Sequence, residues 1–380
     1  MNLITSNLRF KDFSDSWLKV KFQSLCMKIS SGRSKIKEVG QFPVYGSTGK
    51  LGYTNEFTHD GKFILVARVG ANAGQLNCVN CKFGVTDNTL VIELNNEDEF
   101  HFYFYLLQSV NLNRFIFGSG QPLITGGMLK SLNIIQPSVI AERKKIADFL
   151  SSVDKKISLL KEKHALLQQY KKGVMQKLFK QEIRFKNDNG NAFPDWLEKS
   201  MGQVLTPEIR EIPKPNEKYL ALGIRSHMKG TFQKPDSDPN NIAMEKLYVV
   251  RPNDLVLNIT FAWEGAIAIA CQEDDGGLVS HRFPTYLFKK DQATHRYFKH
   301  IIQLKRFKYL LDLISPGGAG RNRVLSKSEF LKLKWELPSI EEQEKIADFL
   351  DALDTKIDAV SKKIELTQTF KKGLLQQMFV

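Results

Sequence analysis

The chain has 380 residues, of which 42% are hydrophobic, and it carries a formal net charge of +14 at pH 7. This length predicts more than one domain, and the excess of Lys and Arg favours a polyanionic partner, although solvated lysines on helix faces would give the same charge. No apolar run approaches the roughly 18 residues needed to span a membrane, and the first ten residues lack the apolar core of a signal peptide. We therefore expect a cytoplasmic protein that does not contact a membrane.

Residues 1–139 predict a globular domain of short strands and glycine-rich turns. The segment opens with Arg9-Phe-Lys-Asp-Phe13 and Trp17. An aromatic run at Phe100–Leu112 predicts a helix, and Pro137 follows the last strand and precedes a long helix. Turn residues bound the runs with strand character, which are Phe42–Gly46, Gly49–Gly52, Gly61–Ala67, Thr89–Glu93 and Leu129–Ile135.

Residues 140–180 predict one long helix. Its apolar residues recur at alternating spacings of four and three, which is the heptad pattern of a coiled coil. The positions of this seam are Ile146, Leu150, Val153, Ile157, Leu160 and Leu167. Gly173 stands late in the helix, where glycine costs about 1 kcal/mol relative to alanine. We expect a frayed or kinked last turn at this glycine; close approach of another helix or of a partner is the alternative.

Residues 181–339 follow the same plan with different residues. They open with Arg184-Phe-Lys186 and Phe193-Pro-Asp-Trp196, which resemble the opening of the first domain. His295–Leu313 predicts a helix rich in Phe, Tyr and Lys. Both globular domains are therefore expected to be mixed, with an α+β fold. The strands of this second domain are expected within Tyr248–Leu257, Gly265–Ala270 and Leu331–Leu337.

Residues 340–380 repeat the first long helix. Ile340–Phe379 aligns with Ile140–Phe179 at a constant offset of 200 residues, and about half of the paired positions are identical. Gly373 is the counterpart of Gly173, with the same expectation. The matching seam is Ile346, Leu350, Leu353, Ile357, Val360 and Ile364. The chain is thus expected to contain globular domains at 1–139 and 181–339 and coiled-coil helices at 140–180 and 340–380.

An apolar seam is unstable in water, and this chain has two of them. The simplest arrangement is that the two helices pack on each other, and they lie antiparallel if a pseudo-two-fold axis relates the two domain–helix units. We expect this intramolecular pair. Two alternatives remain open: each helix only caps its own domain, or each forms a coiled coil with another chain.

The motifs of common catalytic and metal sites are not found in the sequence. Gly46-Ser-Thr-Gly-Lys50 is not a phosphate-binding loop, because that motif needs glycine at position 44 and Ser or Thr at position 51, where Val44 and Leu51 stand. There is no G-x-G-x-x-G after a strand and no H-E-x-x-H. Cys78 and Cys81 have C-x-x-C spacing, but no second pair completes a zinc site, so we expect ordinary strand and turn cysteines. We expect neither a catalytic residue nor a metal in this chain.

A binding function remains. Basic, amide and aromatic side chains in the loops can reach phosphates and base edges, although a surface arginine or a packed tyrosine is the alternative for each. The candidate DNA-binding residues of the first domain are Tyr45, Ser47, Lys50, Tyr53, Arg68, Asn72, Arg114 and Gln121, and those of the second are Arg225, His227, Lys229, Trp263, Arg282, Arg321, Asn322 and Arg323.

The whole pattern resembles the specificity (S) subunit family of type I restriction–modification enzymes. The features that carry the resemblance are the domain–helix–domain–helix order and the paired helix starts, Lys145-Ile-Ala-Asp-Phe-Leu150 and Lys345-Ile-Ala-Asp-Phe-Leu350. Shorter matches are Pro43-Val-Tyr-Gly46, Val66-Ala-Arg68 and Arg251-Pro-Asn-Asp-Leu-Val256 with Trp263-Glu-Gly265. Each short motif alone is weak, whereas the doubled arrangement is specific and covers nearly the whole chain.

The resemblance implies two target-recognition domains, each reading one half of a bipartite site in double-stranded DNA. It also implies that the helices fix the spacer and dock two methyltransferase (M) subunits, which restriction/translocase (R) subunits then join. S-adenosylmethionine, ATP and magnesium would be bound by those partners, and this chain would be a non-catalytic subunit without a cofactor. Two other classes stay open: a fragment of a bifunctional restriction enzyme with its own catalysis, and a coiled-coil scaffold that binds protein.

Overall fold

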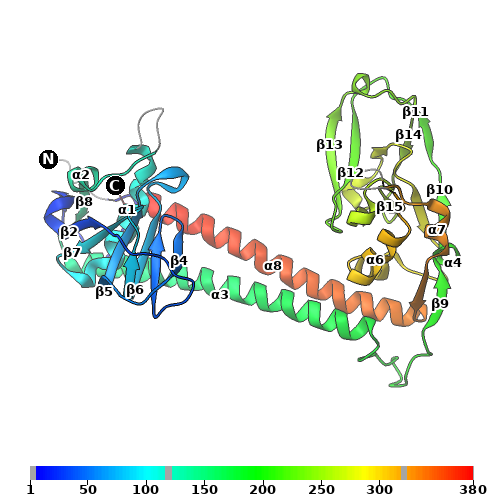
Figure 1. The fold of residues 1–380 in the computed structure, drawn as a ribbon, viewed down its shortest axis with the longest axis horizontal. Helices are drawn as coiled ribbons and strands as arrows, with labels where there is room; N and C mark the ends of the chain where they lie inside the picture. Colours follow the sequence, from blue (N-terminus) through cyan, green and yellow to red (C-terminus); the bar gives the residue numbers. More distant parts are fainter. Residues whose placement is uncertain (1–5, 116–121, 318–322, 380) are drawn as a thin grey trace. The chain divides into compact units, whose positions relative to one another are not determined.

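The computed structural model describes residues 6–115, 122–317 and 323–379 (Figure 1). It has an α+β fold, as expected, and divides into two compact units. Unit 1 comprises Met1–Ala165 with Ala359–Val380, and unit 2 comprises Leu166–Asp358. We use head 1 for the described residues of 1–139 and head 2 for residues 181–339. The two long helices, α3 (Ile140–Phe179) and α8 (Ile340–Met378), each contribute residues to both units.

Head 1 is built on one six-stranded sheet. Neighbouring strands are antiparallel except for the parallel pair β3 and β6. The order across the sheet is β2 (Cys26–Ser31), β7 (Thr89–Leu94), β5 (His59–Ala67), β6 (Leu76–Val85), β3 (Phe42–Gly46) and β4 (Gly49–Thr54). A separate antiparallel pair, β1 (Trp17–Lys21) and β8 (Asn133–Pro137), leads into α3.

The central strand β5 explains how this sheet is buried. Its residues 63–67 are all buried, because apolar side chains point alternately to the two faces of a strand and both faces are covered. Ile64 and Val66 pack in one cluster with the aromatic helix α1 (Phe100–Val110), whereas Phe63 and Leu65 pack in a second cluster on the opposite face. The continuous apolar run in the sequence therefore corresponds to a fully covered strand.

Head 2 has two larger sheets. The first has the order β10 (Leu205–Glu208), β18 (Thr285–Phe288), β15 (Leu255–Leu257) and β16 (Ile267–Ile269). The second has the order β11 (Glu211–Pro213), β14 (Lys246–Val249), β17 (Leu278–Val279), β12 (Tyr219–Ile224) and β13 (Thr231–Ser237). Val256 of β15 packs in a cluster with residues of β12 and β17, while Leu255 and Leu257 pack toward the helices. The four-stranded sheet is thus sandwiched between the other sheet and a helical layer.

Three expectations about the strands and helices of the heads are wrong. The strand expected over Leu129–Ile135 begins only at Asn133, because a short helix α2 (Gly126–Ser131), capped by Thr125, precedes it. Likewise, the strand expected over Leu331–Leu337 is β19 (Lys334–Leu337), preceded by helix α7 (Lys327–Lys332) with Ser326 as its cap. Both cap side chains accept a hydrogen bond from a backbone N–H of the first helical turn, which favours a helix start.

The third concerns the helix expected over His295–Leu313. It is divided into α5 (His295–Ile301) and α6 (Lys305–Leu313), because Leu304 adopts an extended backbone conformation between them. No proline or glycine marks this break in the sequence. Head 2 also contains the pair of β9 (Leu197–Ser200) with β19 and the single-turn helix α4 (Met201–Val204).

The long helices close both cores. In unit 1, Leu374 and Met378 of α8 belong to the same core cluster as Ile146 and Leu150 of α3. In unit 2, Leu178 of α3 belongs to a core cluster with the first turns of α8 and with helix α5. Neither helix therefore only caps the domain that precedes it, and that alternative is excluded.

Burial of the expected seam positions varies along the helices. Nine are buried, namely Ile146, Leu150, Val153, Ile157, Ile346, Leu350, Leu353, Ile357 and Val360, and three, Leu160, Leu167 and Ile364, are half-buried. The half-buried seam positions are confined to residues 160–167 of α3 and to residue 364 of α8.

Of the frayed or kinked last turn expected at Gly173 and at Gly373, the fraying is contradicted. Both glycines lie inside continuous helix, and a Cβ atom added at either would meet no atom within 4 Å.

Among the described residues, no helix is long and apolar enough to cross a membrane.

Candidate nucleic-acid interface

The candidate residues of head 2 gather around the loop that joins β12 to β13. The Arg225 backbone N–H donates to the Gly230 carbonyl oxygen at 2.9 Å, which closes the loop. His227 and Met228 have φ angles of 62° and 55°. Two successive left-handed residues are uncommon outside glycine and are typical of tight hairpin turns. The turn leaves Arg225, His227 and Lys229 exposed.

Backbone contacts hold this hairpin loop against a 3-10 turn, η6 (Ala262–Glu264). The His227 N–H donates to the Glu264 carbonyl oxygen and the Met228 N–H to the Gly265 carbonyl oxygen, each at 2.9 Å. The Ser226 hydroxyl also donates to Glu264 Oε2 at 2.7 Å. Gly265 has a φ of 85°, and a Cβ there would lie 2.6 Å from Met228 Sδ. Glycine is therefore required for the loop and the turn to pack this closely.

Further contacts bring the other candidates of head 2 to the same turn. The guanidinium of Arg323 lies 5.3 Å from the ring centroid of Trp263. Arg282 Nη1 donates to the Thr260 hydroxyl at 3.4 Å, two residues before the turn begins. Together with the hairpin loop these residues form one basic and aromatic surface, which we call the head 2 surface: Arg225, His227, Lys229, Trp263, Arg282 and Arg323. Arg321 and Asn322 lie outside the described residues.

Four candidates of head 1 lie on the hairpin of β3 and β4. Lys50 Nζ lies 2.8 Å from the Tyr53 hydroxyl oxygen and 4.1 Å from the centroid of its ring. The ring of Tyr45 packs edge-on against Phe83, and burial raises the pKa of its hydroxyl. Ser47 is half-buried in the turn. Lys50 is exposed, but its ammonium is held over the Tyr53 ring.

The other candidates of head 1 lie around the end of β5. The Arg68 N–H donates to the Asn88 carbonyl oxygen at 2.9 Å, and its Nε is buried without a partner among the described residues. Asn72 lies in the 3-10 turn η2 (Gly70–Asn72), and the exposed guanidinium of Arg114 lies 4.9 Å from the Phe115 ring centroid. The Thr86 N–H donates to the Tyr45 carbonyl oxygen at 3.0 Å. The turn at 86–88 therefore contacts both the β3–β4 hairpin and the residue that follows β5. Gln121 lies outside the described residues.

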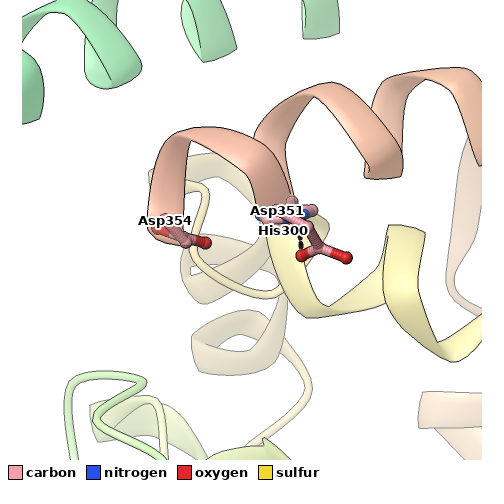
Figure 2. A group of neighbouring side chains, drawn as sticks. All are labelled: His300, Asp351 and Asp354. Atoms are coloured by element: carbon pink, nitrogen blue, oxygen red, sulfur yellow. Dashed lines mark hydrogen bonds and ion pairs between the residues drawn. The ribbon is translucent and has the colours of Figure 1, made fainter. Parts of the chain in front are cut away.

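A different polar cluster lies where α5 meets α8. His300 Nε2 lies 3.1 Å from Asp351 Oδ1, and Asp354 follows one turn later on α8 (Figure 2). Among the described residues, the imidazole of His300 and the carboxylates of Asp351 and Asp354 lie close enough together to hold a metal ion. Its carboxylates already have cationic partners, because Arg296 lies 2.9 Å from Asp351 and Lys171 lies 2.5 Å from Asp354. The cluster is therefore an ion-pair network that joins α3, α5 and α8.

His300 is neutral at pH 7. Burial, assisted by the charge of Lys171, lowers its pKa to about 4.

Cys78 and Cys81 both lie in strand β6 as exposed free thiols, so both are strand residues.

Sequence reasoning missed the residues that fasten each head to its helix. Arg9 Nε lies 2.6 Å from Glu142 Oε1, and the carboxylate of Glu142 is fully buried. In unit 2, Arg184 Nη2 lies 2.7 Å from the equally buried Glu342. The sequence does contain these residues twice, because both domain openings have Arg-Phe-Lys and both long helices have a glutamate in the first turn. Only the structure shows that each arginine contacts the glutamate of the helix that follows it.

Both mixed α+β heads carry basic and aromatic side chains of the kinds that contact nucleic acids. Comparison with known proteins gives the family. The family model described as the type I restriction modification DNA specificity domain matches residues 15–169 and 234–368. This chain belongs to that family, and it is thus a specificity subunit with a DNA-recognition role and no catalytic one.

Individual relatives agree. The EcoprrI specificity subunit of Escherichia coli is 31% identical over 98 residues, which is 26% of this chain and 24% of that protein. The MjaVIII specificity subunit of Methanocaldococcus jannaschii is 24% identical over 331 residues, covering 82% of this chain and 77% of that one. The chain thus spans about a quarter of the first relative and about three quarters of the second.

Solved structures show the same fold. The crystal structure of the type I restriction–modification S subunit from M. genitalium covers 99% of both chains, with a TM-score of 0.65 and 18% identity. A chain from a study of complex assembly and conformational transition in the type I system covers 95% of this chain and 97% of that one, with a TM-score of 0.52 and 14% identity.

Proposed function

We propose that each head of this chain reads one half of a bipartite DNA site within a type I restriction–modification complex. The recognition domains are residues 1–139 and 181–339. The exposed arginines and lysines supply phosphate contacts, and the amide and aromatic groups beside them supply base contacts. The two surfaces differ in residue type and in loop structure, so they are suited to two unlike half-sites.

The observation that carries this proposal is a repeated pair of ionic contacts between the two long helices. Lys371 lies 2.7 Å from Asp154 in unit 1, and Lys171 lies 2.5 Å from Asp354 in unit 2. Lys371 is the counterpart of Lys171, and Asp354 is the counterpart of Asp154, at the 200-residue offset of the repeat. A two-fold rotation that exchanges the two helices would therefore exchange the two ion pairs. This exchange supports a pseudo-two-fold repeat in which residues 140–180 and 340–380 form an antiparallel coiled coil.

The helices then set the spacer. α3 has 40 residues, which at a rise of ~1.5 Å per residue is a length of about 60 Å. A continuous helix that belongs to both units is suited to fixing the distance between two readers, and the separation of readers determines the separation of half-sites.

The outer faces of the same helices suit two copies of one partner. Leu166 and Tyr170 of α3 are 58% and 54% exposed, and their counterparts Leu366 and Phe370 of α8 are 62% and 55% exposed. Gly173 and Gly373 follow three residues later, with open space beside each. An apolar pair next to a glycine allows a partner helix to approach closely. We assign these two surfaces to the two methyltransferase subunits, with R subunits, S-adenosylmethionine, ATP and magnesium in the rest of the complex.

The test is to map methylated sites after replacing one head. The chain, co-expressed with its methyltransferase partner, should methylate a bipartite sequence with a fixed gap. Exchanging residues 1–139 for the corresponding head of a related subunit should change one half-site and leave the other half-site and the gap unchanged. A change in both half-sites, or methylation of a continuous sequence, would contradict the proposal.

A further inference from the structure

Head 2 contains a cavity beside the hairpin loop of its DNA-binding surface. Its volume is about 490 Å³, and it is bounded by the five-stranded sheet and by the turn that carries Trp263. Its walls include the aromatic rings of Phe232, Phe261 and Phe283, while Ser226, Asn258 and Glu264 contribute polar groups. A concave, mostly apolar cavity with a few convergent polar groups is the usual form of a ligand-binding site.

The backbone of the sheet makes room for this cavity wall. A Cβ atom at Gly223 of β12 would lie 2.2 Å from the ring of Phe232, so only glycine allows that ring its position. The guanidinium of Arg225 and the ammonium of Lys234 lie 5.3 Å and 5.4 Å from the centroid of the same ring. The cavity therefore opens beside cations that can hold a DNA phosphate.

Glu264 is the one acidic side chain of this cavity lining. Its Oε2 accepts a hydrogen bond from the Ser226 hydroxyl, and none of the described cations forms an ion pair with it. A carboxylate on a DNA-binding surface is repelled by phosphates, which makes it unfavourable unless a donor on the DNA compensates for it. On the bases, such donors are exocyclic amino groups, and carboxylates are known to accept from them.

The geometry points to Glu264 as a base-reading residue whose carboxylate accepts a hydrogen bond from an exocyclic amino group, N4 of cytosine or N6 of adenine. Ser226 orients the carboxylate, and the aromatic rings pack against the base. The carboxylate rejects thymine, because thymine presents the O4 acceptor at the same place and would leave two acceptors facing each other. This inference rests on the proposed function, since it requires head 2 to read one half-site.

The experiment measures base preference at every position of the half-site read by head 2. The wild-type complex with its methyltransferase subunits is first used to find the methylated sequence, and duplexes with single substitutions are then assayed for methylation. Glu264→Gln should lower the preference for cytosine or adenine over thymine at one position by about ten-fold, because the amide can offer a donor to thymine O4. Whether the affected position is cytosine or adenine distinguishes the two amino groups.

Two further variants make the result specific. Glu245→Gln removes one negative charge from an exposed position of the same head outside the cavity lining and should leave every preference unchanged. Ser226→Ala should reduce the preference at the same position as Glu264→Gln, by a smaller factor. The inference is overturned if Glu264→Gln keeps the wild-type preference at all positions, or if it weakens all sequences equally and Glu245→Gln does the same. If the wild-type complex methylates no bipartite site, the proposed function itself fails.

Discussion

Head 1 and head 2 contact the helices in the same way and present different surfaces. In head 1 the Tyr105 hydroxyl donates to Asp154 at 2.8 Å, and in head 2 His300 contacts Asp351 from the corresponding helix. The surfaces have little in common: head 1 has one six-stranded sheet and a lysine folded onto a tyrosine, whereas head 2 has two sheets and an exposed basic loop. The comparison teaches that the contacts to the helices are shared by the two heads, whereas the candidate binding surfaces are not.

The largest expected effect comes from shortening the helices that both heads share. Deleting Ser158–His164 from α3 and Asp358–Ile364 from α8 removes one heptad from each, about 10 Å of helix or roughly three base pairs. Methylation of the original site should fall at least about a hundred-fold, and a site with a shorter spacer should replace it, since each mismatched contact costs about 1–3 kcal/mol. Sequencing of methylated DNA checks this. A deleted protein that still methylates the unaltered site would show that the helices do not set the spacer.

The docking surfaces can be removed one at a time. Tyr170→Glu should leave a complex with one methyltransferase subunit, Phe370→Glu should do the same, and the double variant should bind none, because a charge in an apolar contact costs several kcal/mol unless it is paired. Light scattering after size-exclusion chromatography gives the stoichiometry. Lys172→Glu, an exposed change next to Gly173, serves as the charge control. Two bound subunits in the double variant would place the docking surface elsewhere.

The buried glutamates test whether the two joints are equally strong. Arg9→Ala leaves the fully buried Glu142 without its charged partner and should cost about 3 kcal/mol of the free energy of unfolding of unit 1. Arg184→Ala should cost less in unit 2, because the Trp196 indole N–H still donates to Glu342 at 3.1 Å. Urea unfolding of each variant measures the difference, with Lys19→Ala as an exposed control. Equal losses would mean that the indole contributes nothing.

His300 of head 2 should make unit 2 lose stability in acid. The pKa of His300 is lowered to about 4 in the folded state, below its ordinary value of about 6.5. Between these values the unfolded chain binds a proton that the folded chain does not, so folding stability should fall by up to about 1.4 kcal/mol per pH unit as the pH drops through this window. Unfolding of wild type and His300→Gln between pH 7 and pH 4 isolates this contribution. Parallel stability curves for the two proteins would refute it.

The smallest effects are expected from single surface cations. Lys229→Ala should lower the slope of log affinity against log salt by about one for duplex DNA, and Lys50→Ala should lower it less, because its ammonium is held over Tyr53. Titrations at several salt concentrations, with the methyltransferase subunits bound, measure both slopes. If duplex binding shows no salt dependence at all, the chain is a protein-binding scaffold and not a DNA reader.

The sequence predicts the long helices well because a heptad pattern and a gapless repeat are properties of the chain alone. It also predicts many strands, since the apolar run of β5 is bounded by turn residues in the sequence. It cannot predict the break at Leu304, which is a backbone choice that tertiary packing imposes. Nor can it show that Tyr105 and His300 serve corresponding positions, because a phenol and an imidazole are different residue types, although Tyr105 contacts Ser151 and His300 contacts its counterpart Asp351.

The site is less predictable than the fold. Basic and aromatic loop residues are identifiable from their type, and the structure places six of the head 2 candidates around one turn. Glu264 was not among the candidates, because a search for phosphate contacts selects cations and passes over a carboxylate. Its environment of aromatic rings becomes visible only when strands distant in the sequence pack together.

The division of unit 1 between two distant parts of the chain has a consequence for its biosynthesis. Unit 2 is one continuous segment and can fold as soon as it leaves the ribosome, whereas unit 1 needs Leu374 and Met378, which are made more than 230 residues after head 1. At about 5–20 residues per second this delay is on the order of ten seconds or longer, during which the apolar face of α1 lacks its cover. Nascent head 1 is then the part of the molecule most dependent on chaperones. A chain released before residue 359 is made contains all of unit 2 but lacks the segment that completes unit 1.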